Sequence, residues 1–215
     1  DTTGKNTIAF IYDQVGSFQE GYARAKLGDR WGYINTAGRA QVYQKTRFDF
    51  THAFTNGLSA IRKGDYWGYI NDRFEIVVNP EYFKANPFSD GLAKVEGKNK
   101  VYFVDKTGMP RIDLDEFDVG NYSEGRIRMY KDGFYGYLNK DGVMVIPSQY
   151  TQASDFKEGL ARVQKNGRFG FINKDGKTII PFRYDIAKDF VNGLSLVERQ
   201  GVRFYVDRYG NEWLK

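Results

Sequence analysis

The sequence predicts an all-β chain built from six copies of one short unit. A marker glycine recurs every 34 residues, or 36 in one case: Gly21, Gly57, Gly91, Gly125, Gly159 and Gly193. An aromatic residue stands three positions before each of them: Phe18, Phe54, Phe88, Tyr122, Phe156 and Phe190. With 24 glycines and 17% aromatic residues among 215, the composition favours short strands and tight turns. A period of 20 to 50 residues is typical of repeat architectures.

The fifth copy shows the predicted strands. Residues 160–165 and 168–173 flank Asn166-Gly167, which favours a type I′ hairpin because both central residues of that turn need positive φ. A third strand is expected at 177–180. Each copy is therefore predicted to be a three-stranded antiparallel meander.

A second turn in each copy is marked by a glycine, at Gly38, Gly108, Gly142, Gly176 and Gly210. The second copy has Phe74 at this position. Because Phe tolerates positive φ poorly, that turn is expected to be remodelled. In the fifth copy Pro181 is expected to end the third strand, since proline cannot donate to a ladder.

The middle strand of each meander is apolar on both faces. Pairing across the first turn places Arg162 opposite Phe171 and Val163 opposite Gly170, and directly paired residues share a face. The ring positions are Trp31 and Trp67, followed by a column of Tyr33, Tyr69, Phe103, Tyr137, Phe171 and Tyr205. A strand covered on both faces needs neighbours, so adjacent copies are expected to bury these rings.

Residues 1–215 are predicted to form a single array, with an extra strand at 7–12 before repeats that start near residues 21, 57, 91, 125, 159 and 193. The chain would then contain seven third strands but only six first and six second strands. A closed ring would need equal numbers of the three. Three strands in 34 residues are also fewer than a propeller blade contains. These observations favour an open superhelical array, and the alternative is a closed six-bladed propeller-like ring.

The sequence offers little for catalysis. The single histidine, His52, lies in the longest connector and is interpreted as a surface loop residue. With one histidine and no cysteine, a zinc site would need a carboxylate cluster, and no suitably spaced cluster is present. Residues 113–118 match a calcium loop poorly, because the sixth position requires glycine and is Asp118. The chain is predicted to be no enzyme and to bind neither cofactor nor metal.

Two polar ladders follow the period. A cationic ladder, three residues after the marker glycine, contains Arg24, Lys94, Arg128 and Arg162 and is interrupted by Ala60 and Leu196. It is expected to lie beside the aromatic column as internal scaffolding, with stacking of roughly 0.5–2 kcal/mol per pair. An acidic ladder, just before the marker glycine, contains Glu20, Asp90, Glu124 and Glu158 and is interpreted as turn surface.

The repeat resembles the bacterial WG-repeat (KWG-repeat) family. The signature appears twice in full, as Trp31-Gly32-Tyr33-Ile34-Asn35 and as the matching segment 67–71, and in weaker form at 135–139 and 169–173. The third and sixth copies lack both Trp and Gly. The resemblance implies a bacterial β-repeat scaffold, often in envelope or secreted proteins, and an extracytoplasmic location. It brings no catalytic residues.

A non-catalytic scaffold for protein–protein interaction is the function that these observations favour. The candidate contacts are an acidic segment and two rings outside the period: Asp113, Asp115, Glu116, Asp118, Tyr43 and Tyr130. The alternative is a module that binds glycan or peptidoglycan through exposed rings, and an enzyme is the third possibility. A net charge of +5 with acids interleaved argues against nucleic acid, and no apolar run is long enough for a transmembrane segment.

Overall fold

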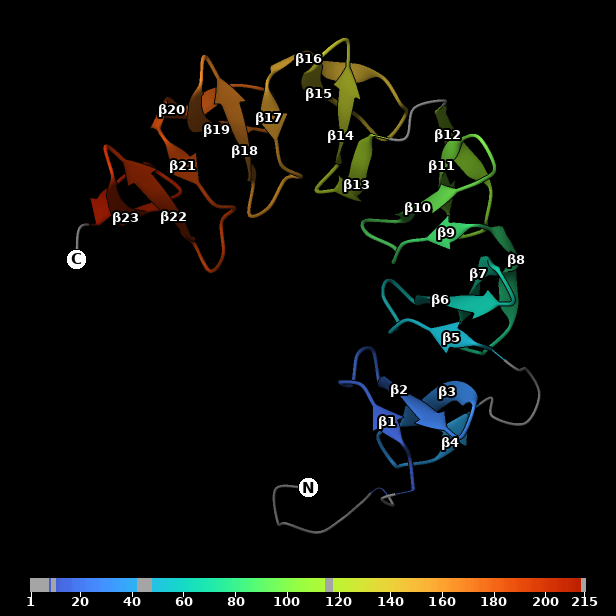
Figure 1. Ribbon diagram of the computed structural model, residues 1–215. Helices are drawn as coiled ribbons and strands as arrows, with labels where there is room; N and C mark the ends of the chain where they lie inside the picture. Colours follow the sequence, from blue (N-terminus) through green and yellow to red (C-terminus); the bar gives the residue numbers. More distant parts are fainter. Residues whose placement is uncertain (1–7, 9–10, 42–47, 115–117, 214–215) are drawn as a thin grey trace. The chain divides into compact units, whose positions relative to one another are not determined.

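The computed structural model describes residues 8, 11–41, 48–114 and 118–213, in two compact units, 1–115 and 116–215 (Figure 1). Regular structure in these residues is β throughout. Among them, no helix is long and apolar enough to cross a membrane. The all-β fold of six tandem antiparallel units is confirmed. The single array and its choice between open and closed forms concern the arrangement of the two units and stay predictions.

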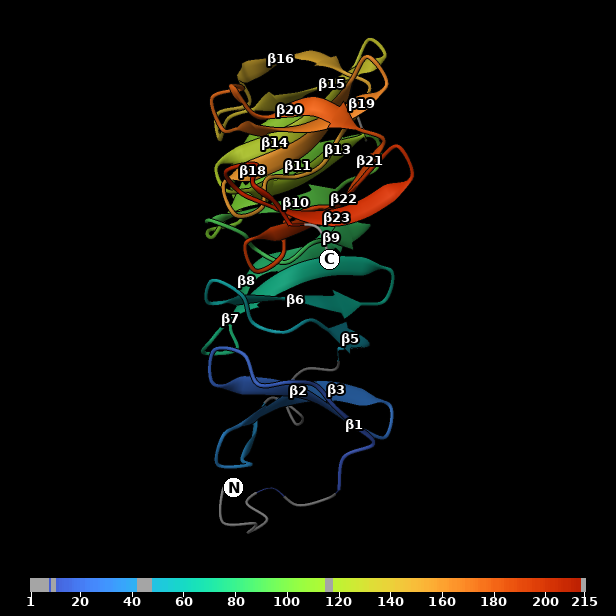
Figure 2. The ribbon, with the colours of Figure 1, turned by 90° about the vertical axis from the view of Figure 1, so that its left-hand side faces the viewer.

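Each unit contains three antiparallel sheets whose strands follow one another in chain order. The first unit contains β1 (Gln14–Val15), β2 (Tyr22–Leu27), β3 (Arg30–Asn35) and β4 (Ala40–Gln41); β5 (Phe50–Thr51), β6 (Leu58–Lys63), β7 (Tyr66–Asn71) and β8 (Ile76–Tyr82); and β9 (Lys84–Ala85), β10 (Leu92–Glu96), β11 (Val101–Asp105) and β12 (Pro110–Leu114). Figure 2 shows these sheets as successive layers.

The second unit repeats this plan. Its sheets are β13 (Val119–Ser123), β14 (Arg126–Lys131), β15 (Phe134–Leu138) and β16 (Met144–Tyr150); β17 (Gln152–Ala153), β18 (Leu160–Lys165), β19 (Arg168–Asn173) and β20 (Thr178–Tyr184); and β21 (Ile186–Ala187), β22 (Leu194–Arg199), β23 (Val202–Asp207) and β24 (Glu212–Trp213). The strand β24 confirms a third strand in the sixth copy. Of the extra strand expected at 7–12, residues 7, 9 and 10 fall outside the described residues, and residues 8, 11 and 12 are not in a strand.

The prediction of three strands per copy is wrong by one strand. The connector before each marker glycine supplies a fourth, short edge strand, such as β17, in which Ala153 pairs with Val163. A further tight turn then leads into the next strand. In it Glu158 and Gly159 both have positive φ, as a type I′ turn requires. The sequence pattern missed this strand because it has only two residues in every copy except the fourth, where β13 has five.

The predicted hairpin pairing is confirmed, and a break in the third strand explains the recurring glycine. Arg162 pairs with Phe171 and Val163 with Gly170. The third strand β20 runs through Pro181, contrary to the prediction, across a shift in register. At Gly170 an added Cβ would lie 2.7 Å from the Ile180 carbonyl oxygen. Proline at a bulge of an edge strand leaves no ladder donor missing.

The turn at Phe74 keeps the form of the other copies, so the expected remodelling is wrong. Phe74 has φ of 64° and its N–H donates to the Asn71 carbonyl at 2.9 Å, as glycine does in the other copies. Its ring packs between Tyr22, Tyr33 and Phe54, with ring centres 5.3–6.0 Å apart. The packing of the Phe74 ring offsets the strain of its left-handed backbone. The expectation of a remodelled turn took account of that strain only.

Within each unit the apolar core lies between consecutive copies. The marker aromatic of one copy packs on the column ring of the copy before it, as Phe156 does on Tyr137 with ring centres 4.9 Å apart. The column rings with a following copy in the same unit are buried: Tyr33, Tyr69, Tyr137 and Phe171. The last column ring, Tyr205, is 40% exposed, and so is the first marker aromatic, Phe18, at 42%. The rings are therefore shielded by neighbouring copies, as the sequence predicted.

Candidate functional site

The acidic ladder joins consecutive copies. Glu124 accepts a hydrogen bond from the Gly159 N–H at 2.9 Å, and Glu158 accepts one from the Gly193 N–H at 2.8 Å. In the first unit both carboxylate oxygens of Glu20 are used, on the backbone of the next marker turn. These residues are more than turn surface, because each holds the turn of the following copy.

We expect Glu158→Ala to lower the free energy of unfolding by about 1–2 kcal/mol, since a charge-assisted hydrogen bond that is partly exposed is lost. Glu158→Gln keeps a neutral acceptor and should lose less. Urea unfolding of the two variants measures the difference. Equal stability of both variants and the parent would contradict the joining role.

The cationic ladder also joins copies, where the next copy supplies a carboxylate. The Arg162 Nε lies 3.2 Å from Asp189, which also binds the Lys157 ammonium at 3.0 Å. Burial alone would raise the pKa of Asp189, but the two cations outweigh burial and lower it. Arg128 pairs in the same way with Asp155, at 3.4 Å. Arg128 and Arg162 therefore have partners inside the array, in the copy that follows each of them.

The rings that these cations contact are not the directly opposite column rings that the sequence suggested. The Arg162 guanidinium lies over Phe169, 5.3 Å from the ring centre, and Arg128 lies over Tyr135 at 5.0 Å. Both rings are diagonal neighbours on the same sheet face. The directly paired column ring is occupied instead by the marker aromatic of the next copy.

Arg24 is the ladder arginine without such a carboxylate among the described residues. Four residues before the marker glycine, where Asp155 and Asp189 stand in later copies, the second copy has Ala53. The Arg24 guanidinium lies 5.1 Å from the Trp31 ring centre and 5.4 Å from that of Phe50. Its described hydrogen bond goes to the carbonyl oxygen of Thr51 at 3.3 Å.

An open pocket of about 640 Å³ adjoins this guanidinium, between the first two copies; we call it the Arg24 pocket. It is lined by Val15, Gly16, Ser17, Gln19, Arg24, Phe50, His52 and Ala53. The lining contains no carboxylate, and Arg24 gives it positive charge. In the sequence the signal for this pocket was the missing aspartate at position 53.

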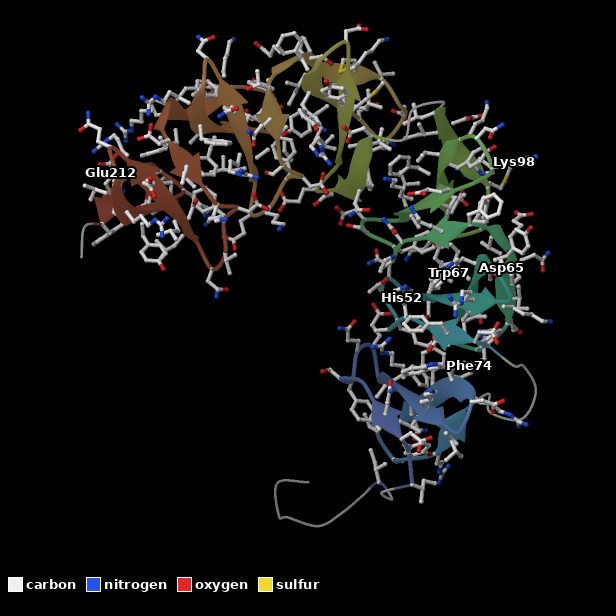
Figure 3. All side chains as sticks on the ribbon, viewed as in Figure 1. His52, Asp65, Trp67, Phe74, Lys98 and Glu212 are labelled. Atoms are coloured by element: carbon white, nitrogen blue, oxygen red, sulfur yellow. The ribbon has the colours of Figure 1, made fainter. Side chains whose placement is uncertain are left out.

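His52 lies in a loop, as the sequence suggested, but its side chain is half-buried in the wall of the Arg24 pocket. Its ring stacks on Trp67 with ring centres 5.2 Å apart; both residues are labelled in Figure 3. Burial, and then the charge of Arg24, lowers the pKa of His52. The ring is therefore neutral near pH 7 and can exchange hydrogen bonds with a ligand.

The sequence-predicted contact residues lie elsewhere. In the first unit, Asp113 is on β12 and binds the Lys100 ammonium at 3.1 Å. In the second unit, Asp118 accepts a hydrogen bond from the Tyr135 hydroxyl at 3.2 Å, and Tyr130 packs on Tyr135 while its own side chain is exposed. Three further candidates fall outside the described residues: Tyr43, Asp115 and Glu116.

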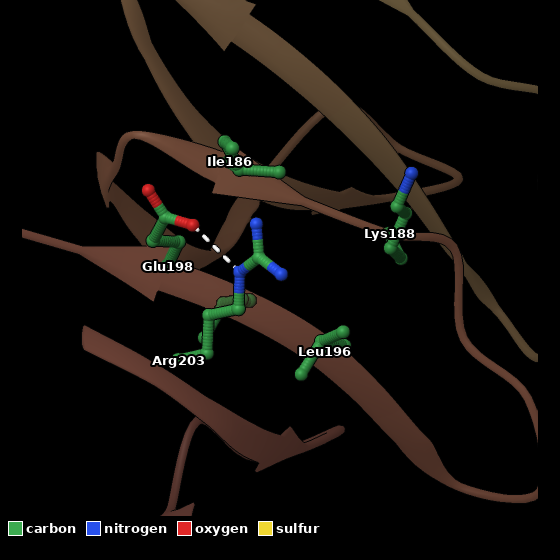
Figure 4. A pocket seen from close by; sticks show the side chains of 6 residues that line it. Ile186, Lys188, Leu196, Glu198 and Arg203 are labelled. Carbon is green, nitrogen blue, oxygen red and sulfur yellow. Dashed lines mark hydrogen bonds and ion pairs between the residues drawn. The ribbon is translucent and has the colours of Figure 1, made fainter. Parts of the chain in front are cut away.

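A second pocket, of about 230 Å³, lies on the last sheet (Figure 4). It is lined by Ile186, Lys188, Leu196, Val197, Glu198 and Arg203. Here the Arg203 Nε donates to Glu198 at 2.8 Å, so the cation is already compensated. Among the described residues, no group of three or more His, Asp or Glu side chains is placed to hold a metal ion.

Solved structures resemble this chain in fold at very low identity. A structure titled as the eukaryotic initiation factor is 9% identical with a TM-score of 0.60, and the match covers 92% of this chain and 63% of that one. Hsv2 from Kluyveromyces lactis is 9% identical (TM-score 0.52; 93% and 76% covered), and Hsv2 from Kluyveromyces marxianus is 11% identical (TM-score 0.52; 91% and 72% covered). This likeness concerns the fold alone.

The repeat itself identifies the family. No curated protein matches the sequence. The family model described as "WG containing repeat" matches residues 1–31, 31–67, 67–102, 135–169 and 169–201. The matched segments contain most of the turns, paired strands and buried rings described above, and they cover most of the chain. The chain belongs to the WG-repeat family.

Proposed function

We propose that this chain is a non-catalytic scaffold that binds a protein partner, and that the Arg24 pocket is one of its contact sites. The observation that carries the proposal is an arginine that lines an open pocket and has no carboxylate beside it among the described residues. In the second unit the equivalent arginines are occupied by Asp155 and Asp189. Arginine stacked on aromatic rings is typical of residues that dominate protein interfaces.

The edge strand beside the pocket favours a protein partner over a glycan. β1 is at the edge of its sheet, and both of its residues are exposed. An extended peptide can add to such an edge by backbone hydrogen bonds, while one side chain enters a neighbouring pocket. A glycan lacks the backbone for this pairing, and the aromatic rings that recur with the period are mostly buried.

Affinity capture tests the proposal with a matched pair of variants. Arg24→Gln removes the guanidinium in the pocket, and Arg30→Gln removes an exposed arginine of the same sheet whose described ion pair is with the adjacent Asp29. A partner should be retained by the parent and by Arg30→Gln and be reduced at least tenfold with Arg24→Gln. If both variants retain the same amount of partner, the Arg24 pocket is not a contact site.

The acidic segment is proposed as a second contact. Asp113→Lys reverses a charge that is half-exposed beside Lys100 and should weaken capture of the same partner.

A glycan array tests the alternative function: binding that is lost with Tyr130→Ala would favour glycan, and a blank array would disfavour it. The envelope location implied by the resemblance is tested by the full reading frame, which should encode a signal peptide or lipobox.

A further inference from the structure

The two units provide an internal comparison for the ligand of the Arg24 pocket. In the second unit, Gly120 leaves room for Asp155: an added Cβ there would lie 2.0 Å from Asp155 Oδ1 and 3.1 Å from the Cβ of Arg128. The same carboxylate accepts a hydrogen bond from the Asn121 N–H at 3.3 Å. An aspartate of the next copy therefore closes this junction over a glycine and an arginine.

The first unit has the same framework without the aspartate. Gly16 is equivalent to Gly120, Arg24 to Arg128 and Ser17 to Asn121, but Ala53 replaces Asp155. The Arg24 stem now lies over Gly16, since an added Cβ would be 2.9 Å from its Cγ and 3.2 Å from its Nε. The guanidinium end faces the pocket, where no side chain of the lining carries negative charge.

We propose that the Arg24 pocket binds a carboxylate of an acidic side chain, presented by an extended peptide that lies along β1. This inference rests on the proposed function and names the chemistry of the contact. The ligand carboxylate takes the role that Asp155 has toward Arg128. Arginine presents several N–H donors in a fixed fork, which matches the two oxygens of a carboxylate.

The surroundings of Arg24 favour a carboxylate from outside the chain. The Arg24 guanidinium lies against both Trp31 and Phe50, whose ring centres are 5.5 Å apart, and these contacts restrict its rotation. One of its nitrogens donates to the Thr51 carbonyl oxygen, and the guanidinium has further N–H groups for a ligand. Neutral His52 and Gln19 offer further polar atoms on the wall. A phosphate would carry more charge than this one arginine balances, because the other described lining residues are uncharged at neutral pH.

A titration of the intact chain with short peptides tests the proposal. The probes are a blocked Gly-Val-Glu-Val-Gly peptide, the same peptide with Gln in place of Glu, free acetate and free glucuronate. The readout is the nitrogen-detected NMR signal of the Arg24 Nε–H group. The Glu peptide should shift this signal saturably and bind at least tenfold more tightly than the Gln peptide, and acetate should shift the same signal weakly.

Ala53→Asp is the decisive variant, because it supplies in the chain the carboxylate that the ligand would bring. It should shift the Arg24 signal without any probe and weaken the Glu peptide at least tenfold. The matched control Ala53→Asn has the same size without charge and should bind the peptide like the parent.

The outcomes separate this inference from the proposed function. If the Glu peptide causes no saturable shift, or if the Gln peptide binds equally well, the proposal that the pocket binds a carboxylate is wrong. If capture of a partner nevertheless depends on Arg24, the scaffold function stands and only its chemistry is wrong. If glucuronate binds more tightly than the Glu peptide, the ligand is not a peptide and the pocket is assigned to an acidic glycan.

Discussion

Tyr137→Ala should lower the free energy of unfolding by about 3–5 kcal/mol. Tyr137 is fully buried, packs on Phe156 of the next copy and donates a hydrogen bond from its hydroxyl to the Ser154 carbonyl at 2.8 Å. Removing a large buried ring leaves a cavity whose cost adds to the lost transfer energy. The variant also leaves the Ser154 carbonyl without this donor. Urea unfolding measures the loss.

Two further variants distinguish the contribution of the Tyr137 ring from that of its hydroxyl, and a ring inside the array from the ring of the last copy. Tyr137→Phe removes only the hydrogen bond and should cost about 1 kcal/mol; the next copy has Phe171 at this position and is buried all the same. Tyr205→Ala changes the equivalent ring in the sixth copy, which is 40% exposed, and should cost well under half of the Tyr137→Ala loss. If Tyr137→Ala and Tyr205→Ala have equal cost, mutual shielding of the copies is wrong.

Gly68→Ala should destabilise the first unit by at least about 2 kcal/mol, although it adds one methyl group. An added Cβ would lie 2.3 Å from the Val78 carbonyl oxygen and 2.7 Å from the Pro80 nitrogen. These are backbone atoms of β8, so the strand must move away and the buried ring of Tyr82 with it. Overpacking that forces a backbone shift typically costs 1–3 kcal/mol.

The control for Gly68→Ala is Gly64→Asn, in the hairpin of the same sheet. Gly64 also has a special backbone, with φ of 63°, but an added Cβ would meet open space. Asn tolerates that conformation, so the change should stay within about 0.5 kcal/mol. Thermal unfolding of the two variants compares them. A Gly68→Ala protein as stable as Gly64→Asn would show that β8 can shift without cost.

A natural comparison supports the reason given for Gly68. In the third copy Tyr102 stands where Gly68 stands in the second, and it pairs directly with Asp113 in an unbroken stretch of ladder. In the second copy the register shifts between Trp67 and Tyr69. The glycine is therefore needed where the third strand bulges toward the middle strand, and a side chain is accepted where the strand pairs regularly.

The sequence by itself determined what depends on near neighbours. Turn pairs such as Asn166-Gly167 fix a register, and alternation then sets the face of every residue, so that pairs such as Val163 with Gly170 follow without a structure. The burial of the column also followed, because a strand that is apolar on both faces requires cover from both sides. These features depend on residues within one copy.

Only the tertiary structure decided which atoms of successive copies meet. Glu158 and Gly193 are 35 positions apart, and no local pattern shows that the carboxylate reaches that N–H. Phe74 keeps a glycine conformation because rings of two copies surround it, which propensity alone cannot show. The Arg24 pocket exists because the second copy has no counterpart of Asp155, which pairs with Arg128 in the second unit. Stacking of the copies brings together residues that are distant along the chain.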